Sequence, residues 1–208
     1  MAATARLDLE TLADPELVSL AQQGDPEARE LLARRYRTPA FRLAMQLVGR
    51  PEVAKDVAQD SMLRFFSSLG RFQAERPVLP WLFCIVHNRV RDLERKRRRQ
   101  RVESLDSYLA DSGYEPVSAQ PDPETKAQRR QLQQLIWRAL NLLSASHREI
   151  LVLRDYQDLS YAEIAAVLGI PKGTVMSRLH AARCSLRKRL QASGEDVPML
   201  EETSRSSP

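Results

Sequence analysis

Glycine, cysteine and aromatic residues are all scarce in this chain. Its 208 residues include seven glycines and two cysteines, and aromatic residues make up 6% of the total. No run of alternating β-branched residues is long enough to predict a strand. Leucine, alanine, arginine, glutamate and glutamine are plentiful, and these residues favour helix. We therefore expect an all-α fold.

Several classes of protein are disfavoured by what is missing. Cys84 and Cys184 have neither the spacing of metal ligands nor the density of a disulfide framework, so we expect reduced thiols. The start of the chain lacks the apolar core of a signal peptide, and no apolar stretch reaches membrane-spanning length. We expect a protein that works in the cytoplasm without membrane insertion.

Motifs of enzyme chemistry are also missing. The sequence contains no phosphate-cradling glycine loop, zinc-binding helix motif or nucleophile elbow. The histidines His87, His147 and His180 lie far apart in sequence and do not suggest a metal site. We expect no catalytic residue, no metal and no cofactor.

The composition does allow a core and points to a polyanionic partner. Hydrophobic residues make up 43% of the chain, which is enough for a folded domain. The formal net charge is +5, and the isoelectric point is about 9.5. A basic balance raises the odds of nucleic-acid binding, although it does not establish it.

Helix start and stop signals divide the chain into two small helical domains joined by a flexible linker. Pro-led starts and glycine ends predict helices from Asp14 to near Gly24, Pro26 to about Gly49, Pro51 to Leu69, and Val78 to about Arg99. Glu124–Leu142 is amphipathic, and Ser144 or Ser146 can cap a helix after it. The predicted organisation is a flexible lead-in (1–13), a first domain (14–100), an acidic linker (101–123), a second domain (124–191) and a disordered tail (192–208).

The stretch from Leu159 to Leu179 predicts a helix-turn-helix. Ser160 and Glu163 form a capping box, Gly169 suits the left-handed end of a helix, and Pro171 prevents that helix from continuing. Such a motif places its second helix in the major groove of DNA. The alternative is a plain helical hairpin whose outer face is only solvated.

The second helix of this motif has a polar outer face. Short polar side chains beside an arginine suit base edges, while a helix N-terminus and further cations suit phosphate. The candidate DNA contacts are Lys172, Gly173, Thr174, Ser177, Arg178, His180 and Arg183.

A second candidate surface is the basic stretch that ends the first domain. Eight cations lie between Arg89 and Arg101, opposed only by Asp92 and Glu94. This density exceeds what a helix end needs to complement its dipole, and it favours contact with a DNA backbone. Just upstream, an aromatic, an imidazole and an amide suit unstacked bases, but the same side chains can instead belong to the core. The candidates in both stretches are Phe83, His87, Asn88, Arg91, Arg95, Lys96 and Arg98, whereas Trp81 fits the core better.

A third surface lies on the helix that starts at Pro51. Asp56, Gln59, Asp60 and Leu63 share the face opposite the apolar stripe. An exposed leucine among acidic and amide groups suggests a protein-binding patch. An ordinary solvated face is the alternative.

The order and spacing of these stretches resemble a known family. Asp56–Arg64, Trp81–Asn88 and Leu159–Leu179 together are similar to extracytoplasmic-function (ECF) RNA polymerase sigma factors of the sigma-70 family. The resemblance covers roughly residues 14–100 and 124–190. It implies an alternative sigma factor that binds core RNA polymerase and directs promoter recognition, DNA melting and transcription initiation. A stand-alone helix-turn-helix regulator is the alternative.

The resemblance also implies partners and site residues. It places Asp56, Gln59, Asp60 and Leu63 against the β′ clamp helices of core RNA polymerase. It also implies a contact with the β subunit of the core enzyme. It assigns the −10 promoter element to the loop around Phe72 and to the helix Trp81–Arg99, and the −35 element to the helix Lys172–Arg189. It implies an anti-sigma factor as a further partner, and an acidic linker whose carboxylates mimic RNA.

The sequence departs from the family at a few positions. The family often has arginine where Cys84 stands, a basic residue where Met176 stands, and another near Ala181. We therefore expect the promoter sequence to differ from that of relatives.

Overall fold

The computed structural model describes residues 9–103 and 123–192, without the side chains of residues 98, 100–103 and 123–131. The described part is helical and contains no strand, as predicted. Residues 1–8 of the predicted lead-in, 104–122 of the predicted acidic linker and 193–208 of the predicted tail lie outside the described residues.

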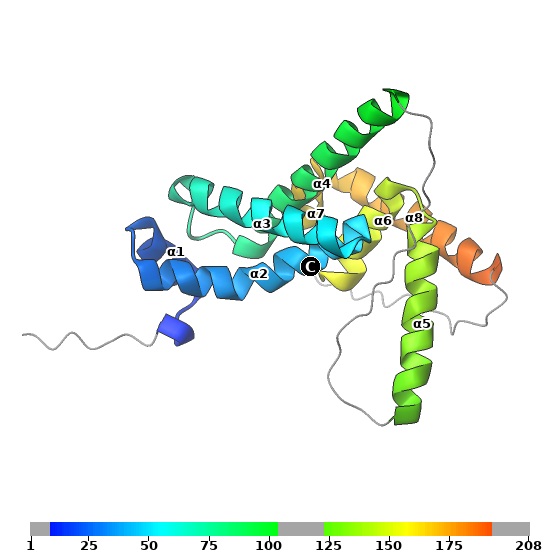
Figure 1. Ribbon diagram of the computed structural model, residues 1–208, viewed down its shortest axis with the longest axis horizontal. Coiled ribbons are helices and arrows are strands. Elements are labelled where there is room, and N and C mark those ends of the chain that lie inside the picture. The colour runs from blue at the N-terminus through cyan, green and yellow to red at the C-terminus, as the bar shows by residue number, and fades with distance from the viewer. Residues whose placement is uncertain (1–8, 104–122, 193–208) are drawn as a thin grey trace, which may run out of the picture.

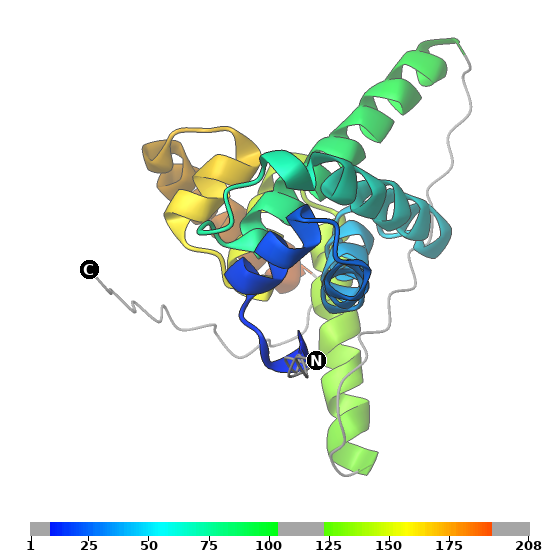
Figure 2. The ribbon, with the colours of Figure 1, turned by 90° about the vertical axis from the view of Figure 1, so that its left-hand side faces the viewer.

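The helices begin and end close to the predicted start and stop signals. A short helical segment, η1 (Leu9–Thr11), lies in the predicted lead-in. The first domain contains α1 (Asp14–Gln22), α2 (Pro26–Val48), α3 (Pro51–Ser68), η2 (Leu69–Arg71) and α4 (Val78–Glu103). The second contains α5 (Pro123–Asn141), α6 (Ala145–Leu151), a π-helical segment η3 (Val152–Tyr156), α7 (Tyr161–Leu168) and α8 (Lys172–Ala192). The end of α4 and the start of α5 project from the body in opposite directions (Figures 1 and 2).

Local chemistry explains where these helices begin and end. The Asp25 carboxylate accepts a hydrogen bond from the Ala28 backbone N–H at 2.9 Å, which caps α2. Gly49 ends α2 with a φ of 72°, a left-handed conformation that costs glycine little. None of the described helices combines the length and the apolar composition that a membrane crossing requires.

Aromatic side chains centre the core of the first domain. Phe65 of α3 is fully buried and contacts Tyr36 of α2 and Trp81 of α4, with ring centroids 6.0 and 4.8 Å away. The Tyr36 hydroxyl donates to Asp14, so α1 is joined to α2 beneath the same cluster. Burial is the main cause that raises the pKa of Tyr36, and the neighbouring Asp14 raises it further. The hydroxyl therefore stays protonated and acts as a hydrogen-bond donor.

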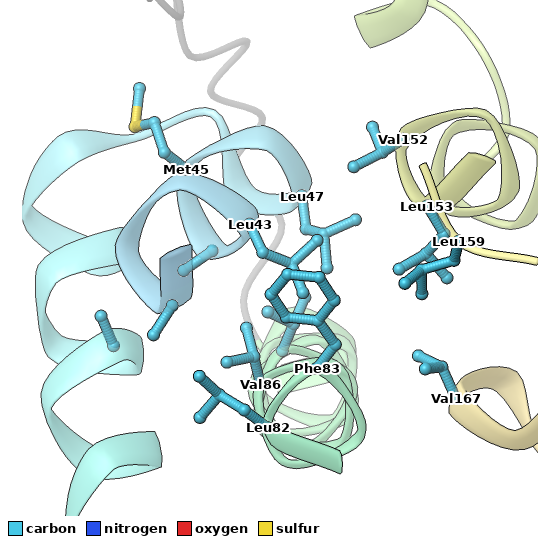
Figure 3. Packing of buried hydrophobic residues seen from close by; sticks show 14 of the residues in the cluster. Leu43, Met45, Leu47, Leu82, Phe83, Val86, Val152, Leu153, Leu159 and Val167 are labelled. Carbon is cyan, nitrogen blue, oxygen red and sulfur yellow. The ribbon is translucent and has the colours of Figure 1, made fainter. Parts of the chain in front are cut away.

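The two domains share one continuous apolar core. Phe83 of α4 lies between Leu47 of α2 and the second-domain residues Leu153, Leu159 and Val167 (Figure 3). Phe83 is 0% exposed, and the other four are 5% exposed or less. The second domain therefore packs directly on α4, and we name this contact the junction.

Candidate nucleic-acid interface

The helix-turn-helix has the predicted geometry. The Glu163 backbone N–H donates to Ser160 Oγ at 3.3 Å, and the Ser160 N–H donates to Glu163 Oε2 at 2.8 Å. Gly169 ends α7 with a φ of 64°. α8 then begins at Lys172, with Val175, Leu179 and three further apolar residues buried along its inner face. These contacts fix the direction of α8, so its outer face points to solvent.

The outer face of α8 carries the predicted −35 residues. Thr174 and Arg178 are half-buried, and the others are exposed, namely Lys172, Gly173, Ser177, His180 and Arg183. The Ser177 hydroxyl donates to the Thr174 carbonyl at 3.2 Å. Arg183 Nη2 pairs with Asp155 Oδ1 at 2.8 Å, an exposed ion pair that a phosphate could replace at little cost. Met176, which stands between these residues, is 56% exposed.

The predicted −10 residues on α4 fall into two groups. Asn88, Arg91, Arg95 and Lys96 are exposed, and Arg98 lies on α4 with its side chain outside the described part. Phe83 and His87 are 0% and 2% exposed, because the second domain covers them. The helical wheel places both residues on the outer face of the first domain, and that face is the junction. Their contact with DNA stays a prediction, and in this conformation DNA cannot reach them.

Phe72 is held in the segment that leads into α4. Its ring stacks on Trp81, with centroids 4.1 Å apart and an interplanar angle of 15°. Gln22 of α1 donates from Nε2 to the carbonyls of Leu69 and Phe72, at 2.9 and 2.7 Å. The ring is half-buried, so one face packs on Trp81 while part of it stays accessible.

The predicted protein-binding patch on α3 is accessible. Leu63 is 64% exposed, and Asp56 and Gln59 are exposed beside it. Asp60 is half-buried, with Oδ2 lying 3.1 Å from Arg64 Nε and 2.5 Å from Arg89 Nε. Because Arg89 belongs to α4, its ion pair with Asp60 fastens α3 to α4. Asp56 is the freer carboxylate of the patch.

A cavity of about 580 Å³ opens at the edge of the junction. Arg91 and Arg95 of α4 line it together with Arg178 of α8, and Glu149 of α6 contributes a carboxylate. Cations from both domains therefore face one space. Within the described residues, no cluster of His, Cys, Asp or Glu could hold a metal ion.

Two polar pairs cross the junction, and the sequence did not predict either pairing. Gln157 Nε2 donates to Gln46 Oε1 at 2.6 Å, and His87 Nε2 lies 3.4 Å from Glu149 Oε2. Periodicity shows which face of each helix is apolar but not which distant element covers it, so no sequence signal marks these pairs.

Family comparisons agree with the two domains. Residues 32–100 match Sigma-70 region 2, and residues 133–186 match Sigma-70 region 4. Among curated relatives, RNA polymerase sigma-H factor of Pseudomonas aeruginosa is 29% identical over 195 residues, covering 91% of this chain and 96% of the relative. ECF RNA polymerase sigma-E factor of Escherichia coli is 31% identical over 186 residues, covering 88% and 96%.

Solved structures of similar fold are sigma factors in complexes. Sigma factor RpoE with anti-sigma factor NepR, from Bartonella quintana, has a TM-score of 0.66 and 25% identity, covering 78% of this chain and 96% of that one. CnrH with the cytosolic domain of CnrY has a TM-score of 0.61 and 30% identity, covering 87% and 99%. With both sigma regions matched in order and the relatives covered almost end to end, this chain belongs to the ECF sigma factors of the sigma-70 family and is an alternative sigma factor for transcription initiation.

Proposed function

We propose that this sigma factor holds a promoter at two points, one on each domain. The outer face of α8 contacts the −35 duplex, and α4 with the Phe72 segment captures the melted −10 strand. The observation that carries this proposal is the pair of cationic helix faces on separate domains: Lys172 and Arg183 on α8, and Arg91 with Lys96 on α4, all exposed. Contacts at both points offset the unstacking of bases, which costs a few kcal/mol per step.

Core RNA polymerase docks on the α3 patch in this proposal. Leu63 supplies an apolar centre, and Asp56 supplies a charge that suits a basic partner surface. The β subunit contacts the second domain, where Leu132 of α5 and Leu142, just after the end of α5, are 37% and 63% exposed. The factor itself does no chemistry and works in the cytoplasm, where polymerase and promoter DNA are found.

An anti-sigma factor is the regulatory partner that we propose. Support comes from the relatives of known structure, which are sigma factors in complex with anti-sigma factors. The α3 patch and the exposed part of α4 lie on the same domain, so one protein bound there can block polymerase and DNA together.

A pull-down with purified core RNA polymerase, followed by transcription from a genomic library, tests the proposal. We expect the chain to bind core with 1:1 stoichiometry and to start transcripts at sites with two separated elements. A stand-alone helix-turn-helix regulator would bind duplex DNA without core and would leave these start sites unchanged. Failure to bind core would reject the assignment.

Leu63 gives this test a sharper form. Because its side chain is 64% exposed, Leu63→Asp should leave the fold intact and still place a charge at the centre of the patch. We expect core affinity to fall about tenfold or more, as for a central interface residue. Leu63→Met is the matched control, since it retains an apolar side chain of similar size. Equal core affinity of the two variants would contradict the placement of the patch.

A further inference from the structure

Met176 is an exposed apolar side chain on the helix that we assign to the −35 duplex. It is 56% exposed and stands at the start of the second turn of α8, directly after the buried Val175. Single exposed apolar residues are common on protein surfaces, so exposure alone assigns no role to this one. The role of Met176 follows from its position among the polar and cationic residues of α8.

Two cations lie on the same edge of α8 as Met176. Lys172 precedes it by four residues and Arg183 follows it by seven, and both spacings bring residues to one side of an α-helix. Both cations are exposed, and so is the ion pair of Arg183 with Asp155. Phosphate contacts position a protein on DNA without reading its sequence. When these cations bind phosphate, the uncharged side chain between them comes to lie against base edges.

Gly173 leaves space beside Met176 on the preceding turn of α8. A Cβ atom at position 173 would meet no other described atom within 4 Å. Because glycine has no side chain, the start of α8 can approach a base pair closely at this point. The methionine side chain is unbranched and has three rotatable bonds, so it adapts to an irregular surface. Met176 can therefore follow the edge of a base within the groove.

The hydrogen-bonding residues of α8 lie on a different edge. Thr174 and Arg178 are half-buried there, whereas Met176 is exposed. Ser177 stands between the two edges, and its hydroxyl donates to the Thr174 carbonyl at 3.2 Å. Polar recognition and apolar contact are therefore separated on the surface of the helix, and Met176 can meet a base pair that the polar residues do not.

Thymine carries the apolar group that suits such a side chain. Its C5-methyl group projects into the major groove, where the other bases are distinguished by hydrogen-bond donors and acceptors. An apolar side chain gains free energy when it removes this methyl group from water. A charged side chain at the same place would lose hydration without gaining a partner. The polarizable thioether of Met176 therefore favours thymine over the other bases.

We propose that Met176 contacts the C5-methyl group of one thymine in the −35 duplex, and that this contact makes the chain select a T·A pair at that position. The inference rests on the proposed role of α8 in −35 binding. It assigns the choice of one base pair to an apolar contact, in addition to the polar contacts that we expect of Ser177 and Arg178.

Deoxyuridine substitution in the promoter tests this inference. Selection from promoters with a randomised −35 element, transcribed by the native chain with core RNA polymerase, first gives the preferred sequence. Each thymine of that element, on either strand, is then replaced in turn by deoxyuridine, which lacks the methyl group but keeps every hydrogen-bonding group. At a subsaturating concentration of the holoenzyme, we expect transcription to fall about fourfold at one position, the effect of one methyl group in an apolar contact.

Two variants assign this loss to Met176. Met176→Gln keeps the length of the side chain but ends in an amide, so it should transcribe equally from the thymine and deoxyuridine promoters. A repeated selection with Met176→Gln should lose the preference for thymine at that position and keep the preferences elsewhere. Met176→Leu is the matched control, since it retains an apolar side chain of similar size and should still distinguish the two promoters. Because position 176 is exposed, both variants should retain the helix content of the native chain.

The outcomes separate this inference from the proposed function. If randomising the −35 element leaves transcription unchanged, the proposed role of α8 is wrong. If the element matters but contains no preferred T·A pair, or if no deoxyuridine lowers transcription, the methyl contact is rejected. An equal loss on deoxyuridine for the native chain and Met176→Gln excludes Met176 as its source. If Met176→Gln instead lowers transcription equally from every promoter or weakens binding to core, Met176 contacts a protein, and the inference is rejected.

Discussion

Two arginines of the proposed DNA interfaces form weak ion pairs with aspartate side chains. Arg183 pairs with Asp155 at 2.8 Å, and Arg95 Nη1 lies 3.6 Å from Asp92 Oδ1, both on exposed surface. Exposed pairs of this kind contribute at most about 1 kcal/mol, so phosphate can displace the carboxylates. Asp60 is different, because one of its two guanidinium partners, Arg89, lies on α4 and so joins that helix to α3. The same residue types therefore serve packing at one place and, in our proposal, DNA contact at another.

Arg178 and Ser177 carry the residue-scale prediction for the −35 element. Arg178→Ala and Ser177→Ala each remove a group that can reach base edges in the major groove, where one good contact is worth about 1–3 kcal/mol. We expect −35-dependent transcription to fall about tenfold for Arg178→Ala and less for Ser177→Ala, whose hydroxyl also bonds to Thr174. Arg37→Ala, on an exposed part of α2, is the control. Unaltered promoter preference in both α8 variants would exclude these residues from the −35 site.

Gly169, at the turn of the helix-turn-helix, and Gly173, near the start of its second helix, give opposite predictions for the free energy of unfolding. Gly169 has a φ of +64°, so Gly169→Ala forces a side chain into the left-handed region and should lower the free energy of unfolding by about 1–2 kcal/mol. Gly173 lies in the first turn of α8, where an added methyl group would meet open space. Gly173→Ala should therefore raise the free energy of unfolding by up to about 1 kcal/mol. Urea denaturation followed by circular dichroism measures both. Shifts of the same sign would contradict the role given to Gly169.

Local signals explain why the elements could be predicted and the junction could not. The Ser160–Glu163 capping box and the glycine after α7 act within a few residues, so the sequence specifies them directly. Phe83 and His87 lie on the outer face of the first domain, as the helical pattern predicts, but their burial depends on elements far along the chain. Helical periodicity does not distinguish a face that meets DNA from one that meets another domain.

Continuity of the core has a consequence for the molecule as a whole. Buried residues of α2 and α4 pack with those of η3 and α7 in one cluster, so the domains stabilise each other while the junction is closed. The α3 patch and the outer face of α8 remain exposed in the same conformation. The closed molecule thus presents its proposed protein-docking and −35 surfaces while it covers part of its proposed −10 surface.

The native thiol of Cys84 reports whether the junction is open. Burial raises the pKa of this thiol, and its hydrogen bond to Ala166 crosses the junction, so its alkylation at neutral pH should be slow in the closed form. Val167→Asp places a carboxylate against Phe83 and Leu159 (Figure 3), which disfavours closure because a buried, unpaired charge is costly. In a Cys184→Ser background, we expect this variant to alkylate at Cys84 about tenfold faster or more, with its helical content retained.

Ala162→Asp is the matched control for this whole-molecule prediction. It adds the same charge in the first turn of α7, where the side chain is exposed instead of buried. Its Cys84 should alkylate at the rate of the parent protein, because the junction can still close around Val167. If both aspartate variants alkylate alike, the junction is not what protects Cys84. If only Val167→Asp is fast, separation of the domains exposes the α4 face that we assign to −10 DNA.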